Sequence, residues 1–355
     1  MTELTLPALQ PWLLPLGAGY FLLLMLLIKI VARGHVLRGV LHHPMVHVLG
    51  LGVSFGAWGL YVQASTAYQI GLNYLSLFMG IATLFMCAPV ILSPILRLVK
   101  NYHLHSLPDL FSFRYHSRQV GQVATSILFS IYLIYLAIQV CMIDYVVQGF
   151  GGHLGHSLAL YFFLILFVLF LYRHMGMSEY RSNKPLVLIV ALQSLIKMSF
   201  LIFLGIACLF WVFDSPQAFD RWLQANPEHI ARLYTPLNSG TWQITLILFS
   251  FMTLLMPHMY QATFVENTRP DELSTASWGV SLYLLPIAIF TPIIMWSAIY
   301  LGYTEHPDHM LRAVTFSLQS PAIALFFYIA MLSAVCSSVM IGLLALSGMV
   351  FHHLM

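Results

Sequence analysis

The stretch Leu49-Gly50-Leu51-Gly52-Val53-Ser54-Phe55-Gly56-Ala57-Trp58-Gly59 decides the fold. It lies inside an apolar segment, 44–66, that is long enough to cross a bilayer, and four of its eleven residues are glycine. Because glycine weakens a helix more than any residue except proline, we expect this helix to unwind near mid-membrane. Unwound backbone in hydrocarbon costs several kcal/mol for each polar group unless that group lines a cavity or meets a ligand. The break therefore indicates a site.

The rest of the chain has the composition of a membrane protein. Of its 355 residues 60% are hydrophobic and 8% are charged, too few ionised side chains for a soluble surface of this size. A spanning helix needs roughly 20 apolar residues, and the apolar runs are continuous rather than alternating, which excludes barrel strands. We expect an all-helical polytopic bundle with nine spans, at about 9–31, 44–66, 72–98, 119–148, 157–173, 185–213, 241–264, 277–302 and 320–350.

Positive charges predict the orientation of these spans. The leader before the first span carries Glu3 and no Lys or Arg, whereas Lys29 follows that span. Since Lys and Arg favour the cytoplasmic side, we expect the N-terminus outside and the C-terminus in the cytoplasm. The inside loops then hold eleven basic residues and the outside loops three. The inside set is Lys29, Arg33, Arg38, Arg97, Lys100, Arg114, Arg118, Arg173, Arg181, Lys184 and Arg269, and the outside set is Arg221, Arg232 and Arg312.

A second interruption lies five spans after the first. Pro257, with His258 and Gln261 close by, falls inside the span 241–264. Taken alone, glycine in a membrane helix favours close packing and proline favours a simple kink. The matched positions of the two interruptions, in two consecutive five-span units, instead favour an inverted-repeat secondary transporter that binds its solute at the midplane.

A cluster of small polar residues lies deep in the last span, at Ser333-Ala334-Val335-Cys336-Ser337-Ser338. Neighbouring hydroxyls can offer two oxygens to a hard cation such as Na⁺, and carbonyls of the unwound segment can complete the shell. The alternative is that these serines bond back to carbonyls one turn earlier and allow tight packing.

Two charged residues lie inside spans, Asp144 towards the outer end of the fourth and Lys197 near the middle of the sixth. Intramembrane charge is costly and usually faces the interior of a bundle, so a functional role is the default expectation. Asp144 is also near enough to the outer interface to be wet. Lys197 can bind an acidic group of the solute, pair with Asp144 or stand in for a cation, and all three roles are open.

Cysteine and histidine do not indicate a resident metal other than Na⁺. The cysteines lie within spans, so we expect no disulfides. Most of the sixteen histidines are scattered through loops, and adjacent pairs such as His352 and His353 are not expected to face one site on a helix. Without a nucleophile–base pair or a metal triad, the chain is not expected to be an enzyme. The cysteines are Cys87, Cys141, Cys208 and Cys336.

Several motifs resemble those of a known family. The loop His105–Tyr115 is similar to a cytoplasmic signature S-x-x-D-F-x-x-x-R-[FY]-G, with His116 in place of the final glycine. Pro257-His258 resembles the Pro-His pair of the family's seventh helix. Tyr135–Gln139 and Phe264–Asn267 resemble Tyr-Ile-Ala-Leu-Gln and Val-Val-Glu-Asn of a kinase-linked group. Together they resemble the sodium:solute symporters, of LeuT-type fold, and above all the symporter-like N-terminal domain of bacterial sensor histidine kinases, over nearly the whole chain.

The resemblance implies a sodium site made by the hydroxyls of Ser337 and Ser338 and the backbone carbonyls around Gly52 and Phe55. The chain departs from the family at two points. Transporting members often carry Asp at the position of Ser54 and Thr at the position of Ser338, so the affinity and identity of the ion are in question.

The resemblance also implies a solute site on the broken part of the second helix and one face of the seventh. Members that take proline carry aromatic residues at the positions of Phe249 and Thr253, so Thr253 argues against assuming that substrate. The residues expected to contact the solute are Ser54, Gly56, Ala57, Phe249, Thr253 and Pro257.

The expected organisation is one membrane domain over residues 1–355. It has a peripheral helix at 9–31, a first five-helix repeat at 44–213 and the first three helices of a second repeat at 241–350, so the last two core helices of the family are missing.

The predicted function is sodium-coupled symport of a small polar organic solute, such as an amino acid, across the bacterial inner membrane. The expected partners are that solute and membrane lipid, and not nucleic acid. The alternative is a solute-sensing input domain that signals to a histidine kinase or response regulator, which would have to lie outside these 355 residues. A purely structural membrane subunit is a third interpretation.

Overall fold

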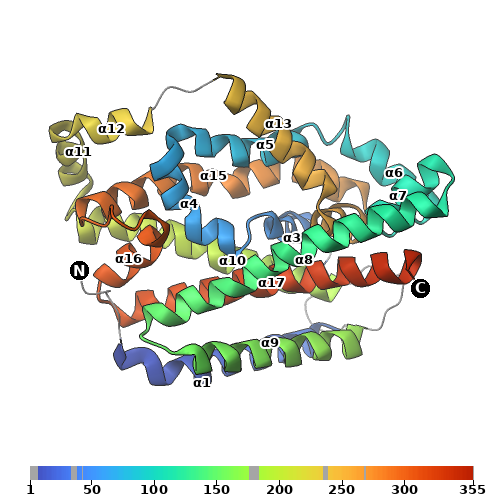
Figure 1. The fold of residues 1–355 in the computed structure, drawn as a ribbon, viewed down its shortest axis with the longest axis horizontal. Helices are drawn as coiled ribbons and strands as arrows, with labels where there is room; N and C mark the ends of the chain where they lie inside the picture. The colour runs from blue at the N-terminus through green and yellow to red at the C-terminus, as the bar shows by residue number, and fades with distance from the viewer. Residues whose placement is uncertain are drawn as a thin grey trace.

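The computed structural model describes residues 7–32, 38–41, 43–175, 184–234, 239–267 and 269–354. Every regular element in these ranges is helical, and the long helices lie side by side in a bundle (Figure 1). The all-helical architecture predicted from the sequence is therefore confirmed for this part of the chain. The long helices are α1 (Leu13–Ala32), α8 (Arg118–Gly149), α9 (Leu154–Met175), α10 (Lys184–Ala207), α13 (Ser239–Leu255), α15 (Pro270–Tyr300) and α17 (Pro321–His353).

Shorter helices connect or interrupt the long ones. The short α-helices are α2 (Arg38–Leu41), α3 (Pro44–Gly50), α4 (Ala57–Ile70), α5 (Leu75–Met86), α6 (Leu92–Tyr102), α7 (Leu107–Tyr115), α11 (Pro216–Ala225), α12 (Pro227–Leu233), α14 (Pro257–Tyr260) and α16 (Met310–Ser317). The 3₁₀ turns are η1 (Pro7–Trp12), η2 (Leu51–Ser54), η3 (Gly71–Tyr74) and η6 (Pro307–His309), and the π turns are η4 (Cys208–Val212) and η5 (Gln261–Val265).

The spans differ from the sequence prediction in the first third of the chain. By length and composition, seven described helices can each cross a membrane, or eight if the bent pair α13 and α14 counts as one more span. The predicted span 44–66 is broken, leaving a short apolar piece at Pro44–Ser54. The predicted span 72–98 is also two helices, α5 and α6. The span 44–66 is thus interrupted where the sequence predicts, whereas the span 72–98 was predicted as one helix and is divided by turns at residues 87–91.

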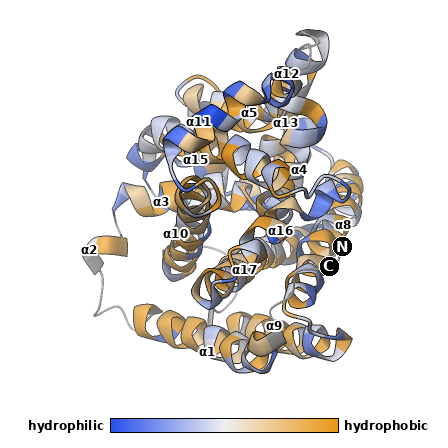
Figure 2. Cartoon of the chain, turned by 90° about the vertical axis from the view of Figure 1, so that its left-hand side faces the viewer, coloured by the Kyte–Doolittle hydropathy of each residue, from blue (hydrophilic) through white to orange (hydrophobic). Residues whose placement is uncertain are grey.

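Helix α17 forms the centre of the bundle. In the most apolar 18-residue stretch of α17, 83% is buried inside the protein, compared with 28–50% in the other membrane-length helices. It packs against α8 and α10 and also contacts the short α14 and α4. By contrast, α1 and α9 pair with each other at one edge of the bundle, where Figures 1 and 2 show them side by side. A residue in the middle of α17 is therefore surrounded by protein.

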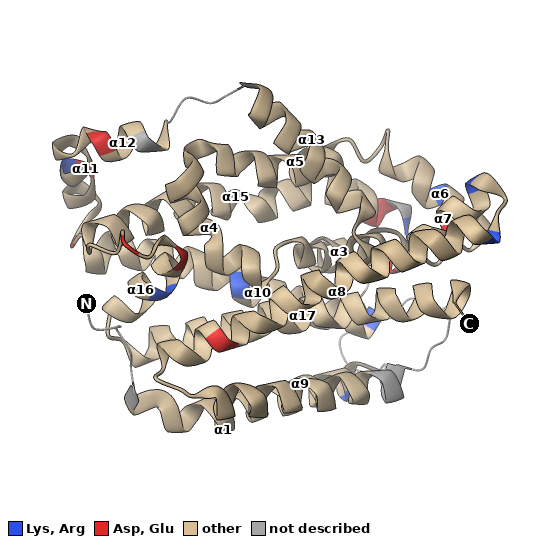
Figure 3. Ribbon diagram, in the orientation of Figure 1, with Lys and Arg blue, Asp and Glu red and all other residues tan. Residues whose placement is uncertain are grey.

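Charged residues lie mainly at the two ends of the bundle (Figure 3). Such a pattern is expected for a bundle whose middle is in hydrocarbon. Of the residues used to predict orientation, Glu3, Arg33 and Arg181 lie outside the described ranges. The orientation of the termini stays a prediction.

Candidate functional site

The glycine-rich stretch breaks its helix where the sequence predicts. Helix α3 passes into the 3₁₀ turn η2, and α4 starts again at Ala57. Between them, Phe55 has φ −107° and ψ 85°, and Gly56 is extended with φ −79° and ψ −175°. The expected unwinding is confirmed, and it leaves backbone groups inside the protein that need partners.

Side chains from distant helices supply those partners. The Lys197 ammonium of α10 donates to the carbonyl oxygen of Gly52 at 2.8 Å, and Phe55 N–H donates to the same oxygen at 3.1 Å. On the other side of the break, Trp58 N–H donates to Oε1 of Gln139, from α8, at 3.2 Å. Both side chains are buried. The break is thus fixed by one cationic donor and one neutral acceptor.

Close packing at the break depends on the missing Cβ atoms of two glycines. A Cβ on Gly52 would lie 2.7 Å from both Cβ and Oγ of Ser194, and 2.7 Å from Cζ of Tyr283. A Cβ on Gly56 would lie 2.6 Å from Gln139 Oε1 and 3.1 Å from Ser338 Oγ. Distances of 2.6 and 2.7 Å are shorter than real Cβ contacts, and 3.1 Å is tighter than most of them, so the glycines let α10, α8 and α17 approach the unwound backbone.

The second break lies at Met256, between α13 and α14. The two helices are bent by 67°, and Pro257 occupies the first turn of α14, where its missing N–H is tolerated. Helix α14 ends at Tyr260 and passes directly into the π turn η5. The interruption predicted around Pro257 is confirmed.

An aromatic cluster lies beside this second break. The His258 ring stacks on Tyr135 of α8 with ring centroids 5.1 Å apart and packs against Tyr132 at 5.3 Å. Among the described residues, the Tyr132 hydroxyl and Nδ1 of His258 are buried without a hydrogen-bond partner. These two atoms remain free to bind a polar ligand or water.

The two breaks lie next to each other. The turn η2 contacts α14, α17 and α10, and α14 also contacts α17. Segments separated by about two hundred residues therefore meet beside the central helix, and the sequence prediction that the interruptions are related in space is consistent with this arrangement.

The residues predicted to hold Na⁺ lie at this meeting point. Ser337 and Ser338 are fully buried on α17, and both hydroxyls donate to the carbonyl of Ala334 at 3.0 Å. This back-bonding is the alternative that the sequence left open. Each hydroxyl proton is used in this hydrogen bond, but the lone pairs of each hydroxyl oxygen can still face a cation. Of the predicted carbonyl ligands, that of Gly52 already accepts the Lys197 ammonium.

The residues predicted to contact the solute fall into two groups. Ser54, Gly56 and Ala57 lie at the first break, and the Ser54 hydroxyl has no partner among the described residues. Pro257 lies at the second break.

Phe249 and Thr253 form the other group, on α13. A Cβ on Gly80 of α5 would meet Phe249 Cβ at 2.9 Å, and Thr253 borders a small gap with Leu84 and Phe85 of the same helix. Thr253 Oγ1 donates to the Phe249 carbonyl at 2.7 Å. Both residues thus pack against α5, and their role in binding solute stays a prediction.

The two intramembrane charges do not pair. Asp144 accepts a hydrogen bond from the Tyr161 hydroxyl at 2.7 Å, and it is half-buried. Within the described residues Lys197 forms no ion pair, so the alternative of an Asp144–Lys197 pair is wrong. The two side chains instead satisfy separate partners on different helices.

The loop that resembles a cytoplasmic signature closes one end of the bundle. Asp109 forms a capping box with Ser106 at the start of α7 and also accepts from His105 N–H. Its Oδ1 lies 2.7 Å from His353 Nε2 and 3.9 Å from His352 Nδ1. The expectation that these adjacent histidines cannot face one site is therefore wrong: both lie within 4 Å of the same carboxylate oxygen, although both belong to the last turn of α17.

Sequence reasoning gave no role to several residues that hold the site together. Gln139 and Ser194 are buried polar residues that touch the glycines of the first break, and Tyr20 of α1 donates to Ser333 Oγ at 2.9 Å. The feature of the sequence that could have identified these residues is that uncharged amide and hydroxyl side chains lie inside predicted spans. The cysteines of the spans, Cys87, Cys141, Cys208 and Cys336, are free thiols.

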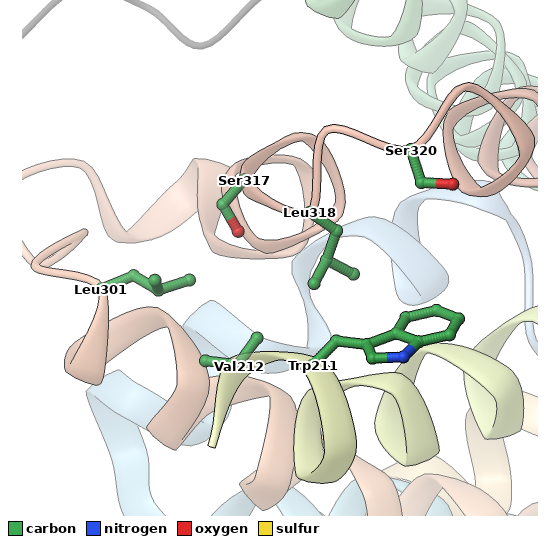
Figure 4. Close-up of a pocket in the computed structure, with 6 residues that line it drawn as sticks. All are labelled: Trp211, Val212, Leu301, Ser317, Leu318 and Ser320. Atoms are coloured by element: carbon green, nitrogen blue, oxygen red, sulfur yellow. The ribbon is translucent and has the colours of Figure 1, made fainter. Parts of the chain in front are cut away.

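A separate pocket of about 420 Å³ lies at the end of the bundle where α10 passes into η4 (Figure 4). Its lining includes two serines, Ser317 and Ser320, together with the ring of Trp211. None of its lining residues belongs to either break, so this pocket is distinct from the predicted solute site.

Comparison with proteins of known structure identifies the fold of the chain. A search of solved structures finds a Na⁺-coupled sialic acid symporter in a substrate-bound, outward-open state, with a TM-score of 0.73 over 96% of this chain and 73% of that chain. This chain has the fold of a sodium-coupled symporter. The two sequences are 12% identical, so the likeness concerns the fold alone, and the LeuT-type bundle predicted from the sequence is confirmed.

The other comparisons return nothing. No family model matches the chain, and no curated protein matches it. Membership of the sodium:solute symporter family and the link to histidine kinases therefore stay predictions.

Proposed function

We propose that the chain is a cation-dependent secondary transporter that moves a small polar organic solute, such as an amino acid, across the membrane by alternating access. The observation that carries the proposal is the unwound backbone at Phe55–Gly56, next to a second broken helix and the central α17. In transporters of this fold class, discontinuous helices present backbone groups to substrate and ions near the midplane.

The polar groups at the breaks suit such a solute. The Ser54 hydroxyl and the extended backbone at Gly56 offer a donor and acceptors on one side. His258 Nδ1 and the Tyr132 hydroxyl offer polar atoms on the other. A buried polar atom without a partner is costly, so a solute that pairs with these atoms gains binding free energy.

The coupling cation predicted from the sequence is Na⁺. The similar solved structure is that of a Na⁺-coupled symporter, which supports sodium as the ion in general. The buried hydroxyls of Ser337 and Ser338 provide oxygen atoms next to the unwound helix, as a hard cation requires.

Two measurements on the purified chain test the proposal. In the first, the twenty amino acids are screened for an increase in apparent melting temperature, because a ligand that binds only the folded state stabilises it. In the second, each hit is tested for counterflow into proteoliposomes loaded with the unlabelled compound. We expect at least one hit to accumulate in loaded vesicles and not in empty ones.

The outcomes separate transport from sensing. Stabilisation without counterflow would contradict transport and favour the solute-sensing alternative. Absence of both, for amino acids and for other small polar organic acids and amines, would contradict the proposed function. The matched control is Gly348→Ala on α17, where an added Cβ meets no atom within 4 Å and should leave counterflow unchanged.

A further inference from the structure

Lys197 is a fully buried lysine whose side-chain nitrogen has an incomplete set of partners. Its side chain is fully buried in the middle of α10, and its ammonium donates one hydrogen bond, to the Gly52 carbonyl. An ammonium has three N–H donors, and the described residues show no carboxylate paired with it. A charge buried in this way needs other oxygen atoms around it.

Two serine hydroxyls border the glycines of the first break. The Ser194 hydroxyl, one turn before Lys197, lies 2.7 Å from the position of a Gly52 Cβ and has no partner among the described residues. On the other side of the unwound segment, the hydroxyl of Ser338 faces Gly56. The break is therefore bordered by two hydroxyl oxygens, and that of Ser194 has no partner in the described residues, so its lone pairs can attract a positive charge.

The ammonium also lies near the second break. Its partner Gly52 belongs to the turn η2, which contacts α14, and α14 carries Pro257 and His258. The Lys197 side chain thus binds the first interrupted helix at the carbonyl that the sequence predicts as a ligand of Na⁺.

We propose that the Lys197 ammonium is a tethered cation that occupies the place of the coupling ion at the Gly52 carbonyl, so that the protein binds its solute without Na⁺. The proposal rests on the proposed function, and at that same site it puts Lys197 in place of Na⁺ as the cation on which solute binding depends. A second monovalent cation is repelled from the same oxygens while Lys197 carries its charge there. Removing the ammonium vacates the site and allows Na⁺ to enter.

The decisive experiment needs no solute. The melting temperature of the purified chain is compared in sodium chloride and in choline chloride at equal ionic strength, because an ion that binds only the folded state raises that temperature. We expect the wild-type protein to melt at the same temperature in both salts. Lys197→Ala should be less stable in choline and should regain stability in sodium, and adding Ser338→Ala should remove this gain.

Control variants keep the experiment interpretable. Lys100→Met removes another lysine that donates to a backbone carbonyl, that of Val265 at 3.1 Å, and should produce no response to sodium. If Lys197→Ala does not fold, Lys197→Gln is used instead, because it removes the charge and keeps a polar side chain that fills more of the space than alanine does. Lys197→Arg keeps the charge and should remain indifferent to sodium.

Opposite results would overturn the inference. If sodium stabilises the wild-type protein, and Lys197→Ala and Lys197→Gln respond no more than it does, the coupling ion binds independently of Lys197. That result would leave solute counterflow intact and so contradict only the tethered cation. Failure of counterflow contradicts the proposed function whatever the salts do.

Discussion

The two helix breaks differ in how their backbone is satisfied. At Phe55–Gly56 the groups freed from the helix bond to side chains that are 81 and 145 residues away in sequence, on α8 and α10. At Met256 the bonds are local: Met256 N–H donates to Met252, and the N–H groups of Met259 and Tyr260 donate to Met256. The backbone of the first break bonds to side chains of other helices as well as to its own chain, and these bonds of the second break are all to its own chain.

From this difference we expect the first break to be rigid and the second to be able to move. A break tied to two other helices cannot change shape unless those helices shift, so it suits a site that must be preorganised. A proline kink with local hydrogen bonds can alter its angle with little loss of contacts elsewhere. We therefore expect substitutions at the first break to be costly and those at the second to be tolerated.

The largest effect should come from Gly52→Ala. The new Cβ would lie 2.7 Å from atoms of Ser194 and Tyr283, forcing α10 and α15 away from the unwound segment. Overpacking of this kind costs about 3 kcal/mol of unfolding free energy. Reversible unfolding in mixed micelles measures it, with Gly348→Ala as the control. Equal stability of the two variants would show that the first break is not tightly held.

Gln139→Leu should have the next largest effect. In the wild-type protein the buried Gln139 side chain accepts a hydrogen bond from the Trp58 N–H at 3.2 Å, and the substitution removes this acceptor. Leaving that N–H without an acceptor should cost about 2 kcal/mol. The control is Gln148→Leu, an exposed glutamine at the end of the same helix, which should change stability little. If both variants unfold alike, the Trp58 contact does not contribute to the break.

At the second break, His258→Phe should change stability by only about 1 kcal/mol or less, because a ring is kept against Tyr135 and a buried atom without a partner is removed. Solute binding should nevertheless weaken if Nδ1 contacts the solute, which isothermal titration of the purified variant measures. A loss of stability as large as that of Gly52→Ala would contradict the comparison between the breaks.

The smallest effect on stability should come from Pro257→Ala. Proline at the first turn of a helix lacks an N–H that has no helical partner in any case, so its replacement should change the unfolding free energy by about 0.5 kcal/mol. Thermal unfolding of the variant beside the wild-type protein checks this value. A substantial destabilisation would mean that the kink is fixed by more than its own chain.

Much of this architecture could be predicted from the sequence. Continuous apolar runs predicted membrane helices, and the glycines near Gly52 and the proline at 257 predicted both breaks, because these residues act through local backbone energetics. The turn at Gly71, whose φ of 56° favours glycine and ends α4, falls in the gap between the predicted spans 44–66 and 72–98. Hydropathy failed at residues 87–91, where local turns divide an apolar stretch into α5 and α6.

The partners of the site could not be predicted in the same way. The contact of Lys197 with Gly52, and that of Gln139 with Trp58, depend on how distant helices pack, which no local pattern encodes. The sequence could only leave Lys197 with three possible roles. The structure excludes one of these roles, the ion pair with Asp144, because the Asp144 carboxylate instead accepts a hydrogen bond from Tyr161.

The most direct test of alternating access is the accessibility of position 54 from each side of the membrane. A single cysteine, Ser54→Cys, is placed in a chain whose cysteines Cys87, Cys141, Cys208 and Cys336 are replaced by alanine. A small, membrane-impermeant thiol reagent is then added to oriented vesicles from one side or the other. Our account predicts labelling from both sides, in separate experiments, and protection from both by a solute that stabilises the protein. Labelling from one side only, unaffected by that solute, would contradict it.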